Sequence, residues 1–393
     1  MAIISNRRSV VAQRAQRVAW SGIRKMFERA LADPSLINLS VGEPDFPTPP
    51  HIVTAAKNAL DEGYTRYSPG LGYATLREAI AVKMERENGL RIDPAREVIV
   101  TAGAMEGIVL ALLATIDPGD EVLIPDPGYT NYEGQVILAG GVPVPVPVSE
   151  RHGFSMAPDD VQAALSPRTR ALLLNTPANP TGGTIQPTHL EGLADLCQDR
   201  GLVVISDEVY EAIIYDGARN LSIATLPGMR DRTATVMSCS KTYAMTGWRV
   251  GYVVAGVEIT AQMQKLQENV VSCVNSAAQM GALAALGGPQ DCVQEMVAEY
   301  DRRRKFLVSA LNAINGIRCP MPSGAFYAFP NIGSFGRSSE EFALYLVDNG
   351  GVVTVPGTAF GKRGEGHLRL CYAVSMPQLE QAIEGIHRAV KAM

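Results

Sequence analysis

The sequence predicts an α/β protein with two lobes: a large lobe with a mainly parallel sheet between helices, and a smaller α+β lobe from the N- and C-terminal segments. Two observations support this. Short apolar runs alternate with longer amphipathic stretches through the middle of the chain, a pattern typical of buried strands separated by helices. The chain also has 393 residues, more than one compact core usually holds.

Six short runs predict buried strands, because they are apolar, often β-branched, and end in polar or turn-forming residues. They are 97–101, 121–125, 171–175, 202–206, 235–238 and 250–255. Helices are expected between them, as at 103–115 and 189–200. Alternating Val and Pro at 142–148 indicates an edge strand or an extended connector, because proline cannot donate to a sheet ladder.

The second half of the chain predicts longer helices and then the small lobe. One long helix is expected over 262–286 and another over 291–315. The small lobe is expected to contain a helix at 338–349, strands at 352–355 and 368–373, and a last helix after Pro377. We therefore divide the chain into an N-terminal segment that packs on the small lobe (1–45), a large domain (46–288) and a small domain (289–393).

Composition excludes several classes of protein. Hydrophobic residues make up 46% and charged residues 19%, which argues against disorder. The net charge of -5 disfavours nucleic acid as a partner. The six cysteines show no Cys-x-x-Cys spacing, so we expect no metal site and a reducing compartment. Arg7, Arg8, Arg14 and Arg17 flank no leader-like apolar segment, and no apolar run approaches the roughly 20 residues that span a bilayer. We expect a cytoplasmic protein that does not enter membranes.

A lysine follows the predicted strand at 235–238, in the run Ser238-Cys239-Ser240-Lys241, and Arg249 comes eight positions later. Burial at a strand end can keep a lysine neutral and make it a Schiff-base nucleophile, while Ser and Arg suit a phosphate. A solvated surface lysine beside a structural arginine would produce the same sequence pattern. Alone, this segment leaves both interpretations open.

A carboxylate and a phenol follow the strand at 202–206, as Asp207 and Tyr210. A carboxylate at this point could keep a pyridine nitrogen protonated and make the ring an electron sink. The alternative is that Asp207 caps a helix.

Two further strand ends carry polar or small residues. Asn175-Thr176-Pro177-Ala178-Asn179-Pro180-Thr181-Gly182-Gly183 holds Asn side chains in a segment stiffened by prolines, although a plain turn has the same composition. Thr101-Ala102-Gly103-Ala104-Met105 leads into a helix whose first N–H groups could approach an anion.

Taken together and in this order, these segments resemble the class I aminotransferases, the fold-type I pyridoxal-phosphate (PLP) enzymes related to aspartate aminotransferase. The resemblance covers nearly the whole chain. It extends to Leu39-Ser40-Val41-Gly42-Glu43-Pro44-Asp45-Phe46, which looks like the N-terminal signature of the family, and to Tyr64-Thr65-Arg66-Tyr67, which resembles the segment lent to the neighbouring subunit. The resemblance implies a seven-stranded type of sheet, pyridoxal 5′-phosphate as cofactor, and a homodimer.

The resemblance also implies roles for individual residues. Lys241 would form the Schiff base and transfer the substrate proton. Asp207 would pair with the pyridine nitrogen, Asn179 and Tyr210 would hold the ring oxygen, and Tyr129 would stack on the ring. The remaining cofactor contacts would come from Gly103, Ala104, Met105, Ser238, Ser240, Arg249 and, across the dimer, Tyr67. The substrate would be held by Arg369 at its α-carboxylate, with Gly42, Ile23 and Asn179 beside it.

Two departures bear on the substrate. A lysine typical of one dicarboxylate-specific subgroup is absent near Met105, and the stretch 272–276 lacks the arginine of other aspartate-specific members. Arg24 could supply the missing positive charge for an acidic substrate side chain, or it could lie on a solvated helix face. We expect transfer from an L-amino acid to a 2-oxo acid such as 2-oxoglutarate. Aspartate or aromatic donors are ranked ahead of alanine and branched-chain ones.

Other functions on the same scaffold remain open from the sequence. A carbon–sulfur β-lyase would need nearly the same cofactor contacts. A PLP-binding regulator is the more distant alternative, and the segment before Leu39 is neither long nor basic enough for a DNA-reading module.

Overall fold

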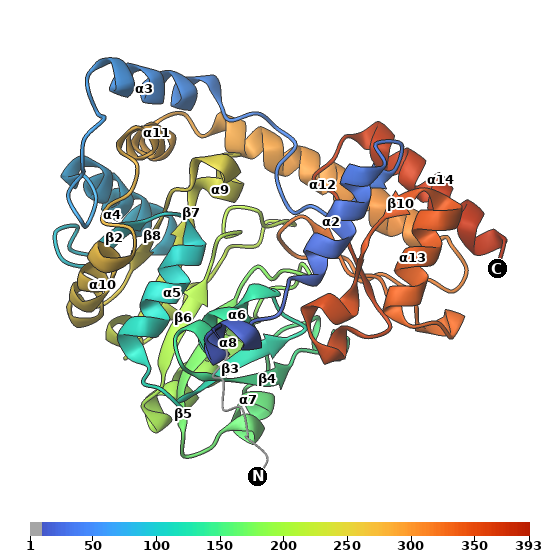
Figure 1. The fold of residues 1–393 in the computed structure, drawn as a ribbon, viewed down its shortest axis with the longest axis horizontal. Helices are drawn as coiled ribbons and strands as arrows, with labels where there is room; N and C mark the ends of the chain where they lie inside the picture. Colours follow the sequence, from blue (N-terminus) through green and yellow to red (C-terminus); the bar gives the residue numbers. More distant parts are fainter. Residues whose placement is uncertain (1–9) are drawn as a thin grey trace, which may run out of the picture.

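A computed structural model describes residues 10–393 of the chain, and its large lobe is built on one seven-stranded sheet (Figure 1). The strands lie across the sheet in the order β2 (Val98–Thr101), β8 (Gly251–Val254), β7 (Thr233–Ser238), β6 (Val203–Asp207), β5 (Thr169–Asn175), β3 (Glu121–Asp126) and β4 (Val142–Pro147). Only β8 runs antiparallel to its neighbours. The predicted mainly parallel α/β sheet is confirmed, and the Val-Pro segment forms its edge strand β4.

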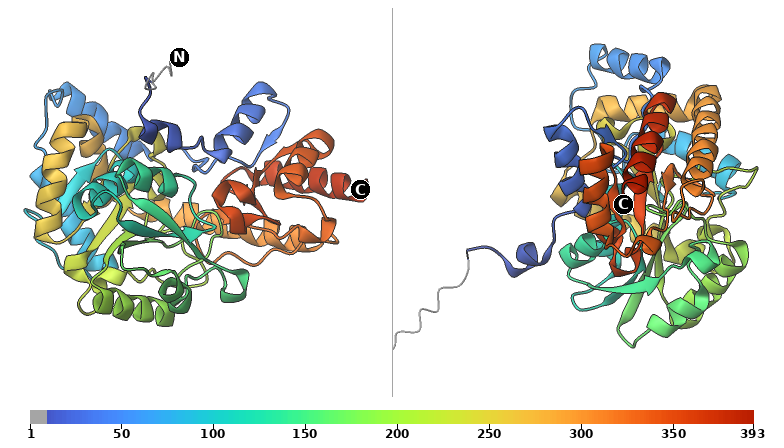
Figure 2. Two further views of the ribbon diagram at one scale, coloured as in Figure 1. Left: turned by 60° about the horizontal axis from the view of Figure 1, so that its bottom comes forward. Right: turned by 90° about the vertical axis from the view of Figure 1, so that its right-hand side faces the viewer.

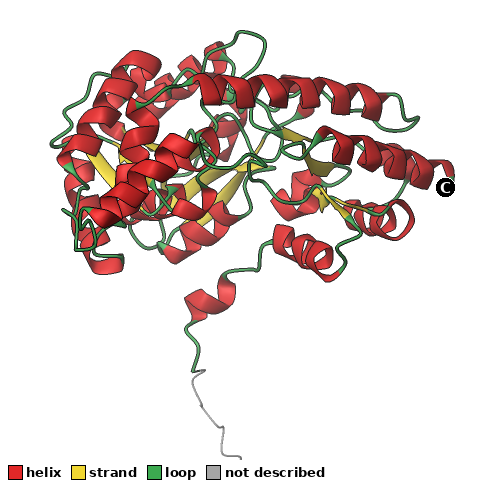
Figure 3. Cartoon of the chain, turned by 90° about the horizontal axis from the view of Figure 1, so that it is seen from above, coloured by secondary structure: helices red, strands yellow, loops and turns green. Residues whose placement is uncertain are grey.

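Helices cover both faces of this sheet (Figure 3). Side chains alternate along each strand, so Ile99 and Val253 pack on one face while Val98, Val100 and Tyr252 pack on the other. The helices of the large lobe are α3 (Pro50–Asp61), α4 (Ala74–Asn88), α5 (Ala104–Thr115), α6 (Asn131–Leu138), α7 (Pro158–Ala164), α8 (Pro187–Arg200), α9 (Cys239–Thr242), α10 (Val257–Val270) and α11 (Ser276–Gly287). Helices α5, α6 and α10 cover the first face, whereas α4, α11, α7 and α8 cover the second.

The single long helix predicted over 262–286 is wrong, because the chain breaks between α10 and α11. Ser272 has a φ of 67°, in the left-handed region that ends helices. The Asn275 side chain then accepts a hydrogen bond from the amide of Ala278 at 2.8 Å and caps α11. The break lets α10 and α11 pack on opposite faces of the sheet.

The smaller lobe is α+β. Its antiparallel sheet has the order β11 (Val355–Pro356), β12 (Leu368–Cys371) and β9 (Tyr327–Ala328), and β10 (Val352–Val353) lies beside it. Its helices are α12 (Asp291–Asn312), α13 (Ser339–Gly350) and α14 (Met376–Lys391). Their apolar sides share one core that includes Phe342, Leu346 and Leu379. Helix α12 ends three residues before the predicted 315.

The N-terminal segment contacts both lobes. Strand β1 (Ile37–Asn38) pairs in parallel with β10, and α2 (Gly22–Ala32) packs against the small lobe. Helix α1 (Gln13–Arg17) lies instead against α6 of the large lobe, where Arg14 Nη1 donates to the Leu138 carbonyl at 3.1 Å (Figure 2). Arg7 and Arg8 lie outside the described residues. Within residues 10–393, no helix is both long enough and apolar enough to cross a membrane.

Candidate active site

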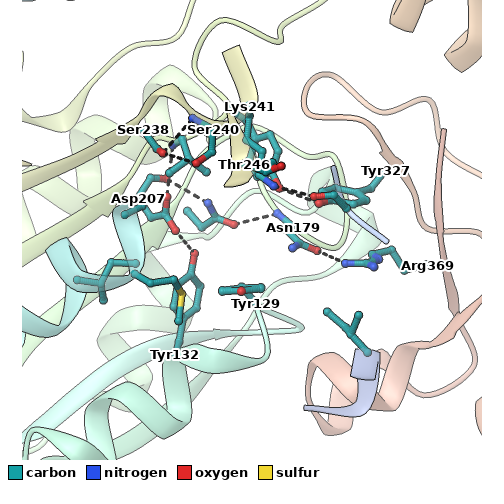
Figure 4. A pocket seen from close by; sticks show the side chains of 18 of the residues that line it. Tyr129, Tyr132, Asn179, Asp207, Ser238, Ser240, Lys241, Thr246, Tyr327 and Arg369 are labelled. Atoms are coloured by element: carbon teal, nitrogen blue, oxygen red, sulfur yellow. Dashed lines mark hydrogen bonds between the residues drawn. The ribbon is translucent and has the colours of Figure 1, made fainter. Parts of the chain in front are cut away.

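One pocket lies where the strands of the large sheet end and the small lobe approaches (Figure 4). Asp207 is the last residue of β6, Ser238 the last of β7 and Asn175 the last of β5. Arg369, from β12 of the small lobe, faces them from the other side. Ligands bind beyond the carboxyl ends of strands in sheets of this kind, so the topology itself favours this position for a site.

Lys241 lies on the one-turn helix α9 and reaches into the pocket. The Ser238 hydroxyl caps this helix by accepting a hydrogen bond from the amide of Ser240 at 3.1 Å. Lys241 Nζ donates to the carbonyl of Gly42 at 2.6 Å. Burial lowers the pKa of Lys241 to about 8, so much of its amine is a free nucleophile at mildly alkaline pH.

Asp207 is the carboxylate in the wall of the pocket that is formed by the end of β6. Tyr132 donates its hydroxyl to Asp207 Oδ2 at 2.6 Å, and the amide of Val209 donates to Oδ1 at 3.3 Å. Burial raises the pKa of Asp207 to about 6, although these two hydrogen bonds oppose the rise. A cation at this wall would restore the ionised form.

Anion-binding groups gather at the end of the pocket nearest α5. The hydroxyls of Ser238 and Ser240 lie 2.9 Å apart, and the guanidinium of Arg249 is held by the Thr246 carbonyl at 2.9 Å. Arg249 itself has a φ of 53°, a strained conformation that is often found at functional sites. Gly103 has a φ of 82°, which favours glycine, and a Cβ there would lie 2.4 Å from Arg249 Nη2 and displace it. The first N–H groups of α5 have no partner within the helix, so this end suits a phosphate.

Tyr129 provides a planar face between these groups (Figure 4). Its hydroxyl accepts a hydrogen bond from Asn131 Nδ2 at 3.2 Å, and its ring meets Tyr132 edge-on at 5.4 Å. These contacts fix the ring, so a flat ligand can stack on it.

Arg369 is almost completely buried, with 1% of its surface exposed. Nη1 donates to Asn179 Oδ1 at 3.1 Å, and Nη2 donates to the carbonyl of Ser40. Its guanidinium lies over the ring of Tyr327, 4.7 Å from the centroid. The buried Nε has no partner among the described residues. A buried guanidinium with an unused donor is suited to a carboxylate ligand.

The sequence analysis missed Tyr132 and Tyr327. Tyr132 lies three residues after Tyr129, at the start of α6, and this short separation is the only local sign that the two side chains share a site. Tyr327 hydrogen bonds through its hydroxyl to that of Tyr210 at 2.7 Å, and a Cβ on Gly42 would lie 2.0 Å from the Tyr327 hydroxyl. No local pattern marks Tyr327, because only the tertiary fold brings it to Gly42.

Most of the predicted site residues line this pocket. They are Ile23, Gly42, Ala104, Met105, Tyr129, Asn179, Asp207, Tyr210, Ser238, Ser240, Lys241, Arg249 and Arg369. Gly103 lies directly behind, against Arg249. Tyr67 is not brought to the pocket, and 88% of its side chain is exposed.

The arrangement fits pyridoxal 5′-phosphate. The cofactor presents a phosphate, an aldehyde, a pyridine nitrogen and a flat ring, and the pocket offers an anion site, a lysine whose pKa is lowered by burial, a buried carboxylate and a fixed aromatic face. The raised pKa of Asp207 supports the match, because a buried carboxylate without a cation is the group that a protonated pyridine would satisfy.

Comparisons with known proteins agree with this geometry. Residues 34–386 match the family described as aminotransferase class I and II. The chain is 42% identical to aromatic-amino-acid aminotransferase 2 of Thermococcus litoralis, over 97% of this chain and 98% of that one. It is 43% identical to an aspartate aminotransferase of Pyrococcus abyssi, over 94% and 96%. The crystal structure of an aromatic aminotransferase from Pyrococcus horikoshii superposes with a TM-score of 0.89 at 44% identity, covering 93% of this chain and 99% of that one.

Proposed function

Because the chain belongs to the class I and II aminotransferases, we propose that the pocket between its lobes is the active site, with Lys241 as the catalytic residue. The protein is a PLP-dependent enzyme that transfers the amino group of an amino acid to a 2-oxo acid. The observation that carries the proposal is the joint placement of Lys241, Asp207 and Arg369 around one cavity. Bound PLP supplies an electron sink for the charge that develops at the substrate Cα.

The protein residues then divide the work. Lys241 Nζ would hold the cofactor at its aldehyde carbon and, once free, would accept and return the proton of the substrate Cα, and its lowered pKa suits this exchange. Asp207 would keep the proton on the pyridine nitrogen. Ser238, Ser240 and Arg249 would bind the phosphate through the anion site at α5.

Substrate binding rests on Arg369. Arg369 lines the pocket, Asn179 and Ser40 hold its guanidinium, and its buried Nε has no partner among the described residues, so we propose that it binds an α-carboxylate. Gly42 also lines the pocket, and its lack of a side chain lets the Tyr327 hydroxyl approach its backbone. The same guanidinium serves the amino acid and the oxo acid in turn, because both carry this carboxylate.

We also infer a homodimer. A groove beside Arg249 is lined largely by apolar side chains, including Val53, Leu60 and Val271. Leu60 and Val271 are exposed, as is Tyr67. A second copy seated on this surface would cover these residues and bring its own Tyr67 to the phosphate end of the site. The six cysteines form no disulfide, which supports a cytoplasmic location.

The relatives named above include enzymes for aspartate and for aromatic amino acids, so we rank these donors first, with 2-oxoglutarate as the usual acceptor. The test is an absorbance screen in which the PLP-loaded enzyme is mixed with each common L-amino acid. We expect conversion to the amino form of the cofactor with a clear order of donors. An unchanged spectrum together with released pyruvate or ammonia would instead identify a lyase. Lys241→Ala is the control and should convert no amino acid.

A further inference from the structure

A second cavity, here called the rear cavity, lies behind the short helix α9 that carries Lys241 (Figure 1). Ser240 and Lys241 line the active site, whereas Cys239 and Thr242 line the rear cavity, and Ser238 lines both. The other walls come from α4, α11, α12 and β8. The volume is about 170 Å³, which at roughly 30 Å³ per water molecule has room for one small organic molecule.

The charges of the rear cavity favour a cation. Its charged lining residues are Lys83, Glu87 and Glu211, so carboxylates exceed ammonium groups by one. Lys83 Nζ already donates to Asn88 Oδ1 at 2.8 Å and to Glu211 Oε1, and an anion would have to displace Glu211 to reach it. Glu87 is freer, because its Oε2 lies 3.9 Å from Lys83 Nζ and 37% of its side chain is exposed. A cation could therefore enter past Glu87 and keep it as a partner.

Tyr252, on β8, supplies an unused polar group to the same cavity. The residue is only 4% exposed, yet its hydroxyl makes no hydrogen bond to any group within residues 10–393. Burial and the nearby Glu211 carboxylate raise the pKa of Tyr252 well above its ordinary value, so the hydroxyl keeps its proton. The neighbouring Tyr243, by contrast, donates its hydroxyl to Gln290 Oε1 at 3.0 Å. Because a buried hydroxyl without a partner costs stability, the Tyr252 hydroxyl indicates a ligand.

The remaining lining suggests the shape of this ligand. Ala212, Leu286 and Val293 provide apolar surface, which a short hydrocarbon stem would cover. The oxygens of Glu87 and Tyr252 lie on different walls, so the head of the ligand needs several N–H donors. A guanidinium has five donors in a plane and is less strongly hydrated than an ammonium, which suits it to a partly buried site.

We propose that the rear cavity is a second ligand site, which binds a small alkylguanidinium. The head bonds to Glu87 and to the Tyr252 hydroxyl, and the stem packs on Leu286 and Val293. The occupant also contacts α9 from behind, so it changes the rate of amino transfer without entering the active site. The binding step does not depend on the proposed function, whereas the effect on the rate rests on it.

The test uses the PLP-loaded enzyme and two probes. Propylguanidine carries the charge, and propylurea has a similar shape without it. Calorimetry measures the affinity of both probes for the wild type, Glu87→Gln, Tyr252→Phe and Glu85→Gln. The last variant is the control, because it removes an exposed carboxylate of α4 that lies outside the cavity. Tyr252→Phe removes a hydroxyl without a partner, so it should fold normally, and urea unfolding checks this. The kcat and KM for the preferred amino donor are measured with and without saturating propylguanidine.

We expect the wild type to bind propylguanidine about tenfold more tightly than propylurea. Glu87→Gln and Tyr252→Phe should each weaken propylguanidine binding several-fold, while Glu85→Gln should have no effect. Saturation should change kcat at least twofold and leave KM for the donor unchanged.

Three results would overturn the proposal: no binding to the wild type, equal affinity for propylurea, or equal affinity in all variants. Competition with the amino donor would also overturn it, because the probe would then occupy the active site. Binding with an unchanged kcat would exclude the link through α9. If the wild type transfers no amino group from any amino acid, the proposed function itself fails, whereas calorimetry still reports on the rear cavity.

Discussion

Replacing Asp207 by asparagine should stabilise the cofactor-free protein while it inactivates the enzyme. Burial raises the pKa of Asp207 from 3.8 to about 6, so the folded state binds this proton more tightly than the unfolded chain. Stability is therefore lost as pH rises from about 4 through about 6. At 1.36 kcal/mol per unit, the ionised carboxylate destabilises the empty protein by about 3 kcal/mol above this window. Asparagine has no charge to bury: its Oδ1 can accept from the Val209 amide, and its Nδ2 can donate to the Tyr132 hydroxyl oxygen in place of the hydrogen bond that Asp207 accepts.

The assay is urea unfolding of the cofactor-free protein at pH 8 and pH 4.5. Asp207→Asn should be more stable than the wild type by about 3 kcal/mol at pH 8, and most of this gain should vanish at pH 4.5. Asp195→Asn, at an exposed position on α8, is the matched control and should show no such pH dependence. After loading with PLP, Asp207→Asn should lose amino transfer by orders of magnitude, because nothing then keeps the pyridine nitrogen protonated. A variant that is no more stable than the wild type at pH 8, or equally stabilised at both pH values, would refute the reasoning.

Three further predictions concern other parts of the site. The rate at which the empty protein takes up PLP should rise with pH around a midpoint near 8, since the Lys241 amine is neutral above its lowered pKa; a midpoint near 10 in stopped-flow absorbance would contradict this. Arg369→Lys keeps the charge but loses the fork, so the dissociation constants of amino acid and oxo acid should rise together, by roughly 30-fold for about 2 kcal/mol; a change in only one would exclude a shared carboxylate site. Tyr67→Phe should weaken PLP binding by about tenfold in the dimer, through one lost hydrogen bond of about 1.4 kcal/mol. An equal effect from the nearby control Tyr64→Phe would show that the hydroxyl of Tyr67 is not the cause.

Local patterns predicted the sheet and the polar residues at its strand ends, whereas the roles of residues such as Tyr129, Gly42 and Arg369 came from the resemblance to the aminotransferases. A buried parallel strand is a short apolar run, and its carboxyl end is where polar residues can reach a ligand. Asp207, Ser238 and Asn179 each follow such a run, so their strands place them at one edge once the strands are parallel. The order of the residues along the chain was enough to bring them together.

Contacts made between distant segments could not be predicted in this way. Tyr327 reaches Tyr210 and Gly42 only because β9 of the small lobe packs against the large lobe, and its neighbours in the sequence give no sign of this. The break between α10 and α11 was missed for another reason. Residues 271–275 continue an apolar pattern with Val271 and Val274, while the signals that end the helix are a single left-handed Ser272 and the cap at Asn275. The periodicity of apolar residues, averaged over a long window, does not reveal a helix end that depends on one or two residues.

The pocket combines two ionisable groups that burial disturbs in opposite directions. The pKa of Lys241 falls to about 8 while that of Asp207 rises to about 6, so in the empty protein the charged form of each group is less favourable than it would be in water. Among residues 10–393, neither group has an oppositely charged partner at hydrogen-bonding distance: Asp207 accepts from Tyr132 and the Val209 amide, and Lys241 donates to the Gly42 carbonyl. A ligand that bonds covalently to the lysine and places a cation against the carboxylate relieves both costs at once. The two buried groups therefore lower the stability of the empty protein and raise its affinity for PLP. Binding of PLP should increase the free energy of unfolding by more than its direct contacts alone would give.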